Sequence, residues 1–116
     1  MMMFDVRSVS VADLDREPPD TVLLDVREDE EWVAGHAAEA IHVPRSQLPA
    51  GLADSGALDG TGRIVVVCRV GARSAQVAAW LSRQGFDAVN LTGGMEAWAQ
   101  SGRSIVGPAG AIGMII

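Results

Sequence analysis

The chain has 116 residues and a mass of 12.2 kDa, and a chain this short rarely forms two separate hydrophobic cores. Hydrophobic residues make up 48% of it and charged residues 21%, which is typical of a globular domain and excludes a disordered or collagen-like chain. The formal net charge of -6 argues against binding to nucleic acids or anionic membranes, because both require a basic protein surface.

Strand and helix patterns alternate in the N-terminal half of the chain. Ser10 is a candidate N-cap for a brief helix, and Gly35 is a candidate end for a second helix whose first turn is acidic. The strands predicted here are residues 3–8, 21–26 and 41–43, of which the second is a nearly continuous apolar run. The predicted helices are residues 11–16 and 28–34, followed by short helical pieces within residues 45–58.

The C-terminal half contains the strongest strand pattern in the sequence. Residues 63–68 form it, and the fully apolar middle of this run predicts a central place in a parallel sheet. A helix is predicted over residues 74–84, with Gly85 at the position of a C-cap. Another strand and a last helix are predicted at residues 88–91 and 94–100. Strands that alternate with helices in this way predict an α/β fold with a parallel sheet.

We predict one domain over residues 1–106 and an apolar tail over residues 107–116. The apolar stretch that starts at Ile105 is about 12 residues long and contains glycine and proline, whereas a membrane-spanning helix needs roughly 20 residues. A cover for a sheet edge and a homodimer contact both fit this tail. The first ten residues do not resemble a secretory signal, so we expect a cytoplasmic monomer or homodimer without nucleic-acid or membrane partners.

Cys68 is the only cysteine of the chain. A single cysteine excludes an internal disulfide and a four-cysteine zinc site, and two histidines add few metal ligands. We therefore predict neither a metal nor another cofactor. All nine cationic residues are arginines, so Schiff-base chemistry and a lysine-bearing phosphate loop are also excluded.

The segment from Cys68 to Ser74 lies between the predicted central strand and a helix, where parallel α/β sheets bind ligands. The unpaired amides and the positive dipole end of the helix favour the thiolate, and Arg69 and Arg73 add positive charge. Gly71 lets the backbone turn so that successive amides point inward as an anion-binding nest. Most lone cysteines are small buried hydrophobic residues, but two arginines within five residues favour a reactive thiolate here.

Several short motifs together resemble the single-domain form of the rhodanese family. They are Asp25-Val26-Arg27-Glu28 with Trp32, Gly35-His36, His42-Val43-Pro44, the segment from Cys68 to Ser74, Gly85-Phe86, and Leu-Thr-Gly-Gly-Met-Glu-Ala-Trp at residues 91–98. The resemblance covers about residues 4–106. It implies a five-stranded parallel sheet flanked by helices on both faces, and a sulfurtransferase whose loop cysteine accepts sulfane sulfur and passes it on.

The resemblance makes Cys68 the catalytic nucleophile. Its thiolate would attack the outer sulfur of a donor such as thiosulfate, leaving sulfite and a persulfide, and a thiol or cyanide would take the terminal sulfur. Asp25 and Arg27 would support the loop through a charged pair. The two arginines would hold the donor oxyanion and the amides would stabilise the persulfide, so the expected substrate-binding residues are Arg69, Val70, Gly71, Ala72, Arg73 and Ser74.

Three other functions are compatible with this scaffold. A protein-to-protein persulfide carrier, loaded by a cysteine desulfurase, would use the same cysteine. A non-enzymatic interaction module is disfavoured because such modules commonly lack the nucleophile. A cysteine phosphatase is disfavoured because its loop has five residues between cysteine and arginine, and only four separate Cys68 from Arg73. The histidines are expected to satisfy backbone groups and the tryptophans to pack: His36, His42, Trp32, Trp80 and Trp98.

Overall fold

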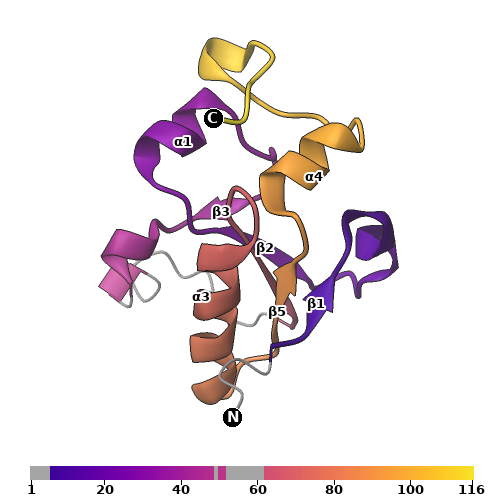
Figure 1. Ribbon diagram of the computed structural model, residues 1–116, viewed down its shortest axis with the longest axis vertical. Helices are drawn as coiled ribbons and strands as arrows, with labels where there is room; N and C mark the ends of the chain where they lie inside the picture. Colours follow the sequence, from indigo (N-terminus) through magenta and orange to yellow (C-terminus); the bar gives the residue numbers. More distant parts are fainter. Residues whose placement is uncertain (1–5, 49, 52–61) are drawn as a thin grey trace.

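The computed structural model describes residues 6–48, 50–51 and 62–116. In this part of the chain five strands form one sheet in the order β1-β5-β4-β2-β3, and all neighbouring strands are parallel (Figure 1). The strands are β1 (Ser8–Val9), β2 (Val22–Asp25), β3 (Ile41–His42), β4 (Ile64–Val67) and β5 (Ala88–Leu91). The predicted five-stranded parallel sheet is confirmed, and β4 lies at its centre.

The apolar run of β4 accounts for its central position. All four of its residues are fully buried, and Val66 lies opposite Leu24 of β2 on one side and Asn90 of β5 on the other. A strand covered on both faces must present apolar side chains to both, which is why its sequence shows no alternation. From its carboxyl end the chain passes directly into Cys68, at the edge where parallel α/β sheets bind ligands.

Helices cover both faces of the sheet, as predicted. They are α1 (Asp29–Ala34), α3 (Ala72–Arg83) and α4 (Gly94–Gln100), with the 3-10 helices η1 (Val11–Arg16), η2 (Arg45–Gln47) and η3 (Pro108–Gly110). Side chains of α3 pack against Leu24 and Val66, whereas those of η1 and α4 pack against Leu23 and Val65. Because successive strand residues point to opposite faces, β2 and β4 contribute to both cores.

The helix after β4 begins two residues earlier than predicted, at Ala72 rather than Ser74. Arg73 and Ser74 therefore belong to its first turn, where the amide groups have no partner within the helix. Gly85 lies one residue after the C-cap Gln84 with a φ of +97°, a left-handed conformation that ends helices and favours glycine.

The first strand is shifted relative to the prediction. β1 consists of Ser8–Val9 rather than residues 3–8, because it pairs only with Asn90 and Leu91 at the end of β5. Residues 3–5 lie outside the described part of the chain. Ser10 ends the strand and caps η1, since its hydroxyl accepts a hydrogen bond from the amide of Asp13.

The helix predicted over residues 28–34 begins at Asp29 in the structure. Glu28 is its N-cap and forms a capping box with Glu31, which satisfies two amides of the first turn. Of the helical pieces predicted within residues 45–58, η2 is present, and residues 49 and 52–58 lie outside the described part.

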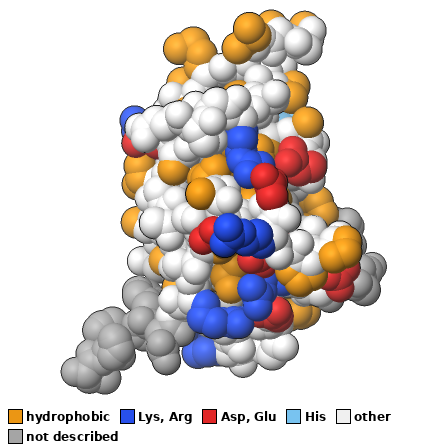
Figure 2. Space-filling view, turned by 90° about the vertical axis from the view of Figure 1, so that its right-hand side faces the viewer, with side chains coloured by type: hydrophobic (Ala, Val, Ile, Leu, Met, Phe, Trp, Pro, Cys, Tyr) orange, Lys and Arg blue, Asp and Glu red, His pale blue; other side chains and the backbone are white. Residues whose placement is uncertain are grey.

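The C-terminal tail folds back on the end of α1. The amide of Gly113 donates to the Ile105 carbonyl, and that of Met114 donates to the Ala34 carbonyl, so these bonds join the tail to segments outside the sheet. Ile115 packs against the core cluster that includes Met95 and Trp98 of α4, while Ile112 is 92% exposed. Figure 2 shows hydrophobic side chains at the end of the molecule where the tail lies. That the tail forms a homodimer contact stays a prediction. The division of the chain into a domain over residues 1–106 and a tail over residues 107–116 also stays a prediction. Within the described residues, no helix has both the length and the apolar composition needed to cross a membrane.

Candidate active site

Cys68 begins the loop between β4 and α3, and hydrogen-bond donors of that loop point at its sulfur. The amide of Gly71 lies 3.1 Å from Sγ, the amide of Ser74 3.4 Å and the Ser74 hydroxyl 3.2 Å. Gly71 reaches this orientation with a φ of +117°, a region that favours glycine. The Cys68 side chain is 1% exposed, whereas Val70 of the same loop is exposed, so the sulfur lies just beneath the surface. Several donors around one sulfur form the environment of a thiolate.

The start of α4 holds the loop in this orientation. The amide of Met95 donates to the Cys68 carbonyl at 2.8 Å, and the amide of Glu96 donates to the Arg69 carbonyl at 3.0 Å. Because these carbonyls face α4, the amides that follow turn toward the sulfur. Gly94 permits this close approach, since a Cβ at that position would lie 2.4 Å from the Cys68 carbonyl oxygen.

The pKa of Cys68 depends on two opposing effects. Burial raises the pKa of the thiol, because a low-dielectric environment disfavours the charged form. The hydrogen bond from the Ser74 hydroxyl and those from the amides of Ser74, Gly71 and Val70 outweigh burial. Together they hold the pKa of Cys68 below its ordinary value, which increases the fraction of nucleophilic thiolate near neutral pH.

The two loop arginines form no hydrogen bond with the sulfur in the described part of the chain. The charge of Arg73 does interact with that of Cys68, and an influence of Arg69 on the thiol stays a prediction. Arg73 donates to both carboxylate oxygens of Glu31 on α1, at 2.8 and 2.9 Å, and Arg69 pairs with Glu96 on α4 at 3.0 Å. The hydrogen bonds that Arg73 donates to Glu31 raise the pKa of Arg73 and lower the pKa of Glu31, so both side chains stay charged at neutral pH. Each guanidinium therefore pairs with a carboxylate on a neighbouring helix, in a chain that has more acidic than basic residues.

The predicted charged pair between Asp25 and Arg27 is present at the end of β2. Arg27 Nη2 lies 2.8 Å from Asp25 Oδ2, and both side chains are fully buried. The same nitrogen donates to the Gly35 carbonyl at 2.8 Å. The pair therefore ties β2 to the end of α1, and its link to the loop is indirect, through the Glu31–Arg73 ion pair.

Trp32 of α1 lies between the two histidine rings of the chain. Its ring centroid is 3.6 Å from that of His36 and 4.5 Å from that of His42, with nearly parallel planes. His36 Nδ1 lies 2.8 Å from the Trp32 carbonyl oxygen, and His42 Nε2 lies 2.7 Å from the Arg27 carbonyl oxygen. Both histidines thus bind backbone groups, as predicted, and the stack fixes the helix that carries Glu31.

Three residues of this site were not predicted from the sequence. Two are the acidic partners Glu31 and Glu96. The third is Asn90 on β5, whose side-chain oxygen lies 2.6 Å from the Ser74 hydroxyl. Asn90 is the one polar residue of β5 and is 8% exposed. A buried polar residue needs a partner, so its position in an apolar strand was the available signal.

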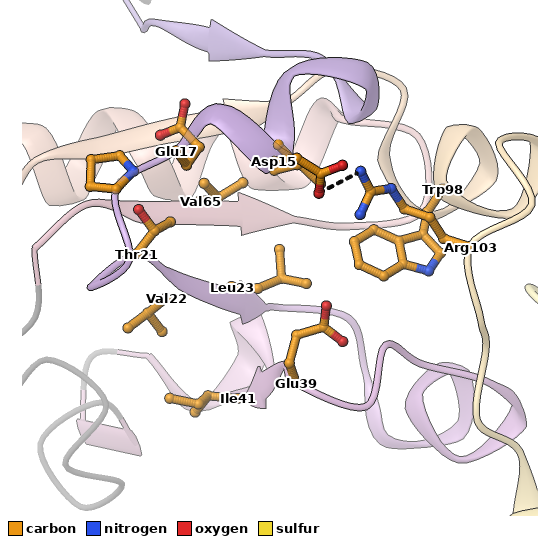
Figure 3. A pocket seen from close by; sticks show the side chains of 12 residues that line it. Asp15, Glu17, Thr21, Val22, Leu23, Glu39, Ile41, Val65, Trp98 and Arg103 are labelled. Carbon is orange, nitrogen blue, oxygen red and sulfur yellow. Dashed lines mark hydrogen bonds and ion pairs between the residues drawn. The ribbon is translucent and has the colours of Figure 1, made fainter.

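A cavity of about 320 Å³ lies on the sheet face covered by η1 and α4 (Figure 3). Leu23, Val65 and Trp98 form part of its apolar wall, and the Asp15–Arg103 ion pair lies at its side. Its described lining includes no cysteine, no histidine and no residue of the Cys68 loop, so we do not place the chemistry there. Within residues 6–48, 50–51 and 62–116, His, Cys, Asp and Glu side chains form no group of three that could hold a metal ion.

The model of the rhodanese-like domain matches residues 9–101. The chain belongs to the rhodanese-like family. A relative from Allochromatium vinosum, named a sulfurtransferase, is 34% identical over 94% of this chain and 100% of its own length. The protein YtwF of Bacillus subtilis is 36% identical over 81% of this chain and 91% of its own length. The crystal structure of a rhodanese-related protein from Thermoplasma volcanium has a TM-score of 0.76 and 33% identity, covering 86% of this chain and 97% of that chain.

Proposed function

We propose that this rhodanese-like chain is a sulfurtransferase that moves sulfane sulfur from a donor such as thiosulfate to a thiol or cyanide through a persulfide on Cys68. The observation that carries the proposal is the set of donors from Gly71 and Ser74 that surrounds the sulfur of the only cysteine. The name of the Allochromatium vinosum relative supports sulfurtransferase activity in general.

The proposed cycle has two displacement steps at sulfur. The Cys68 thiolate attacks the outer sulfur of thiosulfate, the sulfur–sulfur bond of the donor breaks, and sulfite leaves with the bonding electron pair. Cys68 then carries a persulfide anion, which loop amides such as that of Gly71 stabilise. An acceptor thiolate or cyanide attacks the terminal sulfur, leaves as a persulfide or thiocyanate, and restores the Cys68 thiolate. This is covalent catalysis with ping-pong kinetics.

Arg69 is the loop arginine best suited to bind the donor oxyanion. Its Nε pairs with Glu96, its two Nη groups form no hydrogen bond with any residue in the described part of the chain, and its side chain is 50% exposed. Arg73, by contrast, uses both Nη groups on Glu31. We expect Arg69→Ala to raise KM for thiosulfate more than it lowers kcat, with Arg83→Ala as the control. If the Arg69→Ala variant has the same KM for thiosulfate as the wild type, Arg69 does not bind the donor.

The alternative functions are a persulfide carrier, a non-enzymatic interaction module and a phosphatase, and they differ from the proposed one in the sulfur donor or in the use of Cys68. Because the chain has one cysteine, a persulfide has no internal thiol to resolve it, and an external acceptor must complete either cycle. A catalytic efficiency with thiosulfate below about 10 per molar per second would favour a protein donor and the carrier role. The commitment of Arg73 to Glu31 argues further against a phosphatase, whose loop arginine must bind the substrate. We place the reaction in the cytoplasm, where acceptor thiols are kept reduced.

Mass spectrometry of the intact protein tests the proposal directly. After incubation with thiosulfate the protein should gain the mass of one sulfur atom, and cyanide or glutathione should remove it. The Cys68→Ser variant serves as the control and should gain nothing. A wild-type mass that does not change with thiosulfate or with a persulfide-bearing protein donor would contradict the proposed function.

A further inference from the structure

The Ser74 hydroxyl has one proton and several neighbours that can accept it. Ser74 Oγ lies 3.2 Å from Sγ of Cys68, 3.3 Å from the Gly71 carbonyl oxygen and 2.6 Å from the Asn90 side-chain oxygen. Ser74 is fully buried and Asn90 nearly so, which makes the contacts between these residues decisive. One proton cannot serve all these acceptors, so its direction determines how strongly the sulfur is stabilised.

The orientation of the Asn90 amide decides this direction. A thiolate attracts the hydroxyl proton because hydrogen bonds to charged acceptors are the stronger ones. When the Ser74 hydroxyl donates its proton to the thiolate, its lone pairs face the Asn90 side chain. An Asn90 oxygen at 2.6 Å from Ser74 Oγ would then repel these lone pairs. A half-turn of the amide replaces that oxygen with the NH2 group, which donates to Ser74 Oγ. The oxygen and nitrogen of an amide occupy nearly equivalent positions, so the hydrogen-bond network selects the orientation.

We propose that Asn90 is a positioning residue that donates its side-chain N–H to Ser74 and thereby directs the Ser74 hydroxyl proton to the sulfur of Cys68. The inference deepens the proposed function and rests on it for the role of Cys68. In the rotated orientation the Asn90 N–H donates to Ser74 Oγ and the Ser74 hydroxyl donates to Sγ, and hydrogen bonds arranged in sequence like this strengthen one another. The pairing of β5 with β4, with Asn90 opposite Val66, fixes the backbone position from which the Asn90 side chain reaches Ser74.

The charged groups around the site are paired and are not altered by replacing Asn90. Arg73, which interacts with Cys68 through its charge, is held by Glu31 of α1. Arg69 is held by Glu96 of α4. A change in the titration of Cys68 on substitution of Asn90 therefore reports the hydroxyl proton and not a new charge.

The test is the pH dependence of iodoacetamide alkylation of Cys68 in four proteins: the wild type, Asn90→Leu, Ser74→Ala and the double variant. Leucine keeps the size of the amide but cannot donate. We expect Asn90→Leu to move the midpoint upward and lower the thiolate fraction at pH 7 about three-fold, the effect of one lost hydrogen bond. In the Ser74→Ala background the same replacement should change nothing further. An equal shift in both backgrounds, or no upward shift in Asn90→Leu, would overturn the proposal.

A measurement on the wild-type protein covers the case in which a core variant does not fold. The assigned side-chain NH2 signals of Asn90 in an NMR titration should shift with the midpoint of Cys68, and this response should be lost in Ser74→Ala. Signals that stay constant across that midpoint would contradict the proposal. Alkylation needs no sulfur donor, so a protein that shows the coupling but takes up no sulfur would refute the proposed function and leave this inference standing.

Discussion

Replacing Gly71 with alanine tests whether the backbone conformation of the loop activates Cys68. Gly71 has a φ of +117°, and its amide donates to the sulfur at 3.1 Å. An added Cβ has room, because its nearest neighbour, the side-chain amide of Asn90, lies 3.6 Å away, so the substitution costs backbone strain and causes no steric clash. A residue other than glycine in this region costs about 1–3 kcal/mol. The loop relieves that strain by turning the amide away from the sulfur.

Gly85→Ala is the matched control, since Gly85 has a φ of +97° and an added Cβ there meets nothing within 4 Å. It lies beyond the other end of α3, away from Cys68. Both variants should lose about 1–2 kcal/mol of unfolding free energy in urea titrations. Only Gly71→Ala should raise the Cys68 pKa, seen as an upward shift of the alkylation midpoint. A Gly71→Ala protein that is destabilised like the control but alkylated like the wild type would refute the role of this amide.

Two further predictions concern the ion pairs around the loop. Arg73 lowers the pKa of Glu31 in the folded state, so this pair stabilises the protein above the unfolded pKa of about 4.3 and the effect is lost as pH falls through the folded value. Glu31→Gln should therefore unfold more easily than Glu30→Gln at pH 7, and the difference in unfolding free energy between the two variants should shrink as the pH is lowered below about 4.3. A difference that stays constant down to acid pH would count against the pair. Asp25→Asn leaves the buried Arg27 without a counter-ion and should lower the unfolding free energy by about 3–5 kcal/mol; a loss below about 1 kcal/mol in denaturant titrations would contradict this.

The parts of the fold that could be predicted from the sequence are those that depend on short local sequence patterns. The apolar run of β4 indicated a strand buried on both faces, and its position predicted that Cys68 would lie at the ligand-binding edge of the sheet. Gly71 indicated a backbone turn, and the turn does aim amides at the sulfur. These features depend on residues that are close in sequence, so spacing alone was sufficient to identify them.

The partners of the loop arginines could not be predicted in the same way. Glu31 lies 42 residues from Arg73 in sequence, and the two meet only because α1 packs beside the start of α3. Nothing in the local sequence distinguishes Glu31 from its acidic neighbours on α1. The contact between Asn90 and Ser74 likewise depends on the register between β5 and β4. Tertiary placement, and not residue type, therefore decides where the positive charges point.

Ultraviolet titration of the Cys68 thiolate is the most direct test of the central claim, which is that backbone amides and the Ser74 hydroxyl ionise this cysteine. The chain contains one cysteine and no tyrosine, so the thiolate absorbance is free of tyrosinate, and the Cys68→Ser protein supplies the blank. We predict a titration midpoint below the ordinary value of a cysteine thiol, about 8.5, because the hydrogen bonds to Sγ lower the pKa of Cys68. A midpoint at or above that value in the folded protein would contradict it.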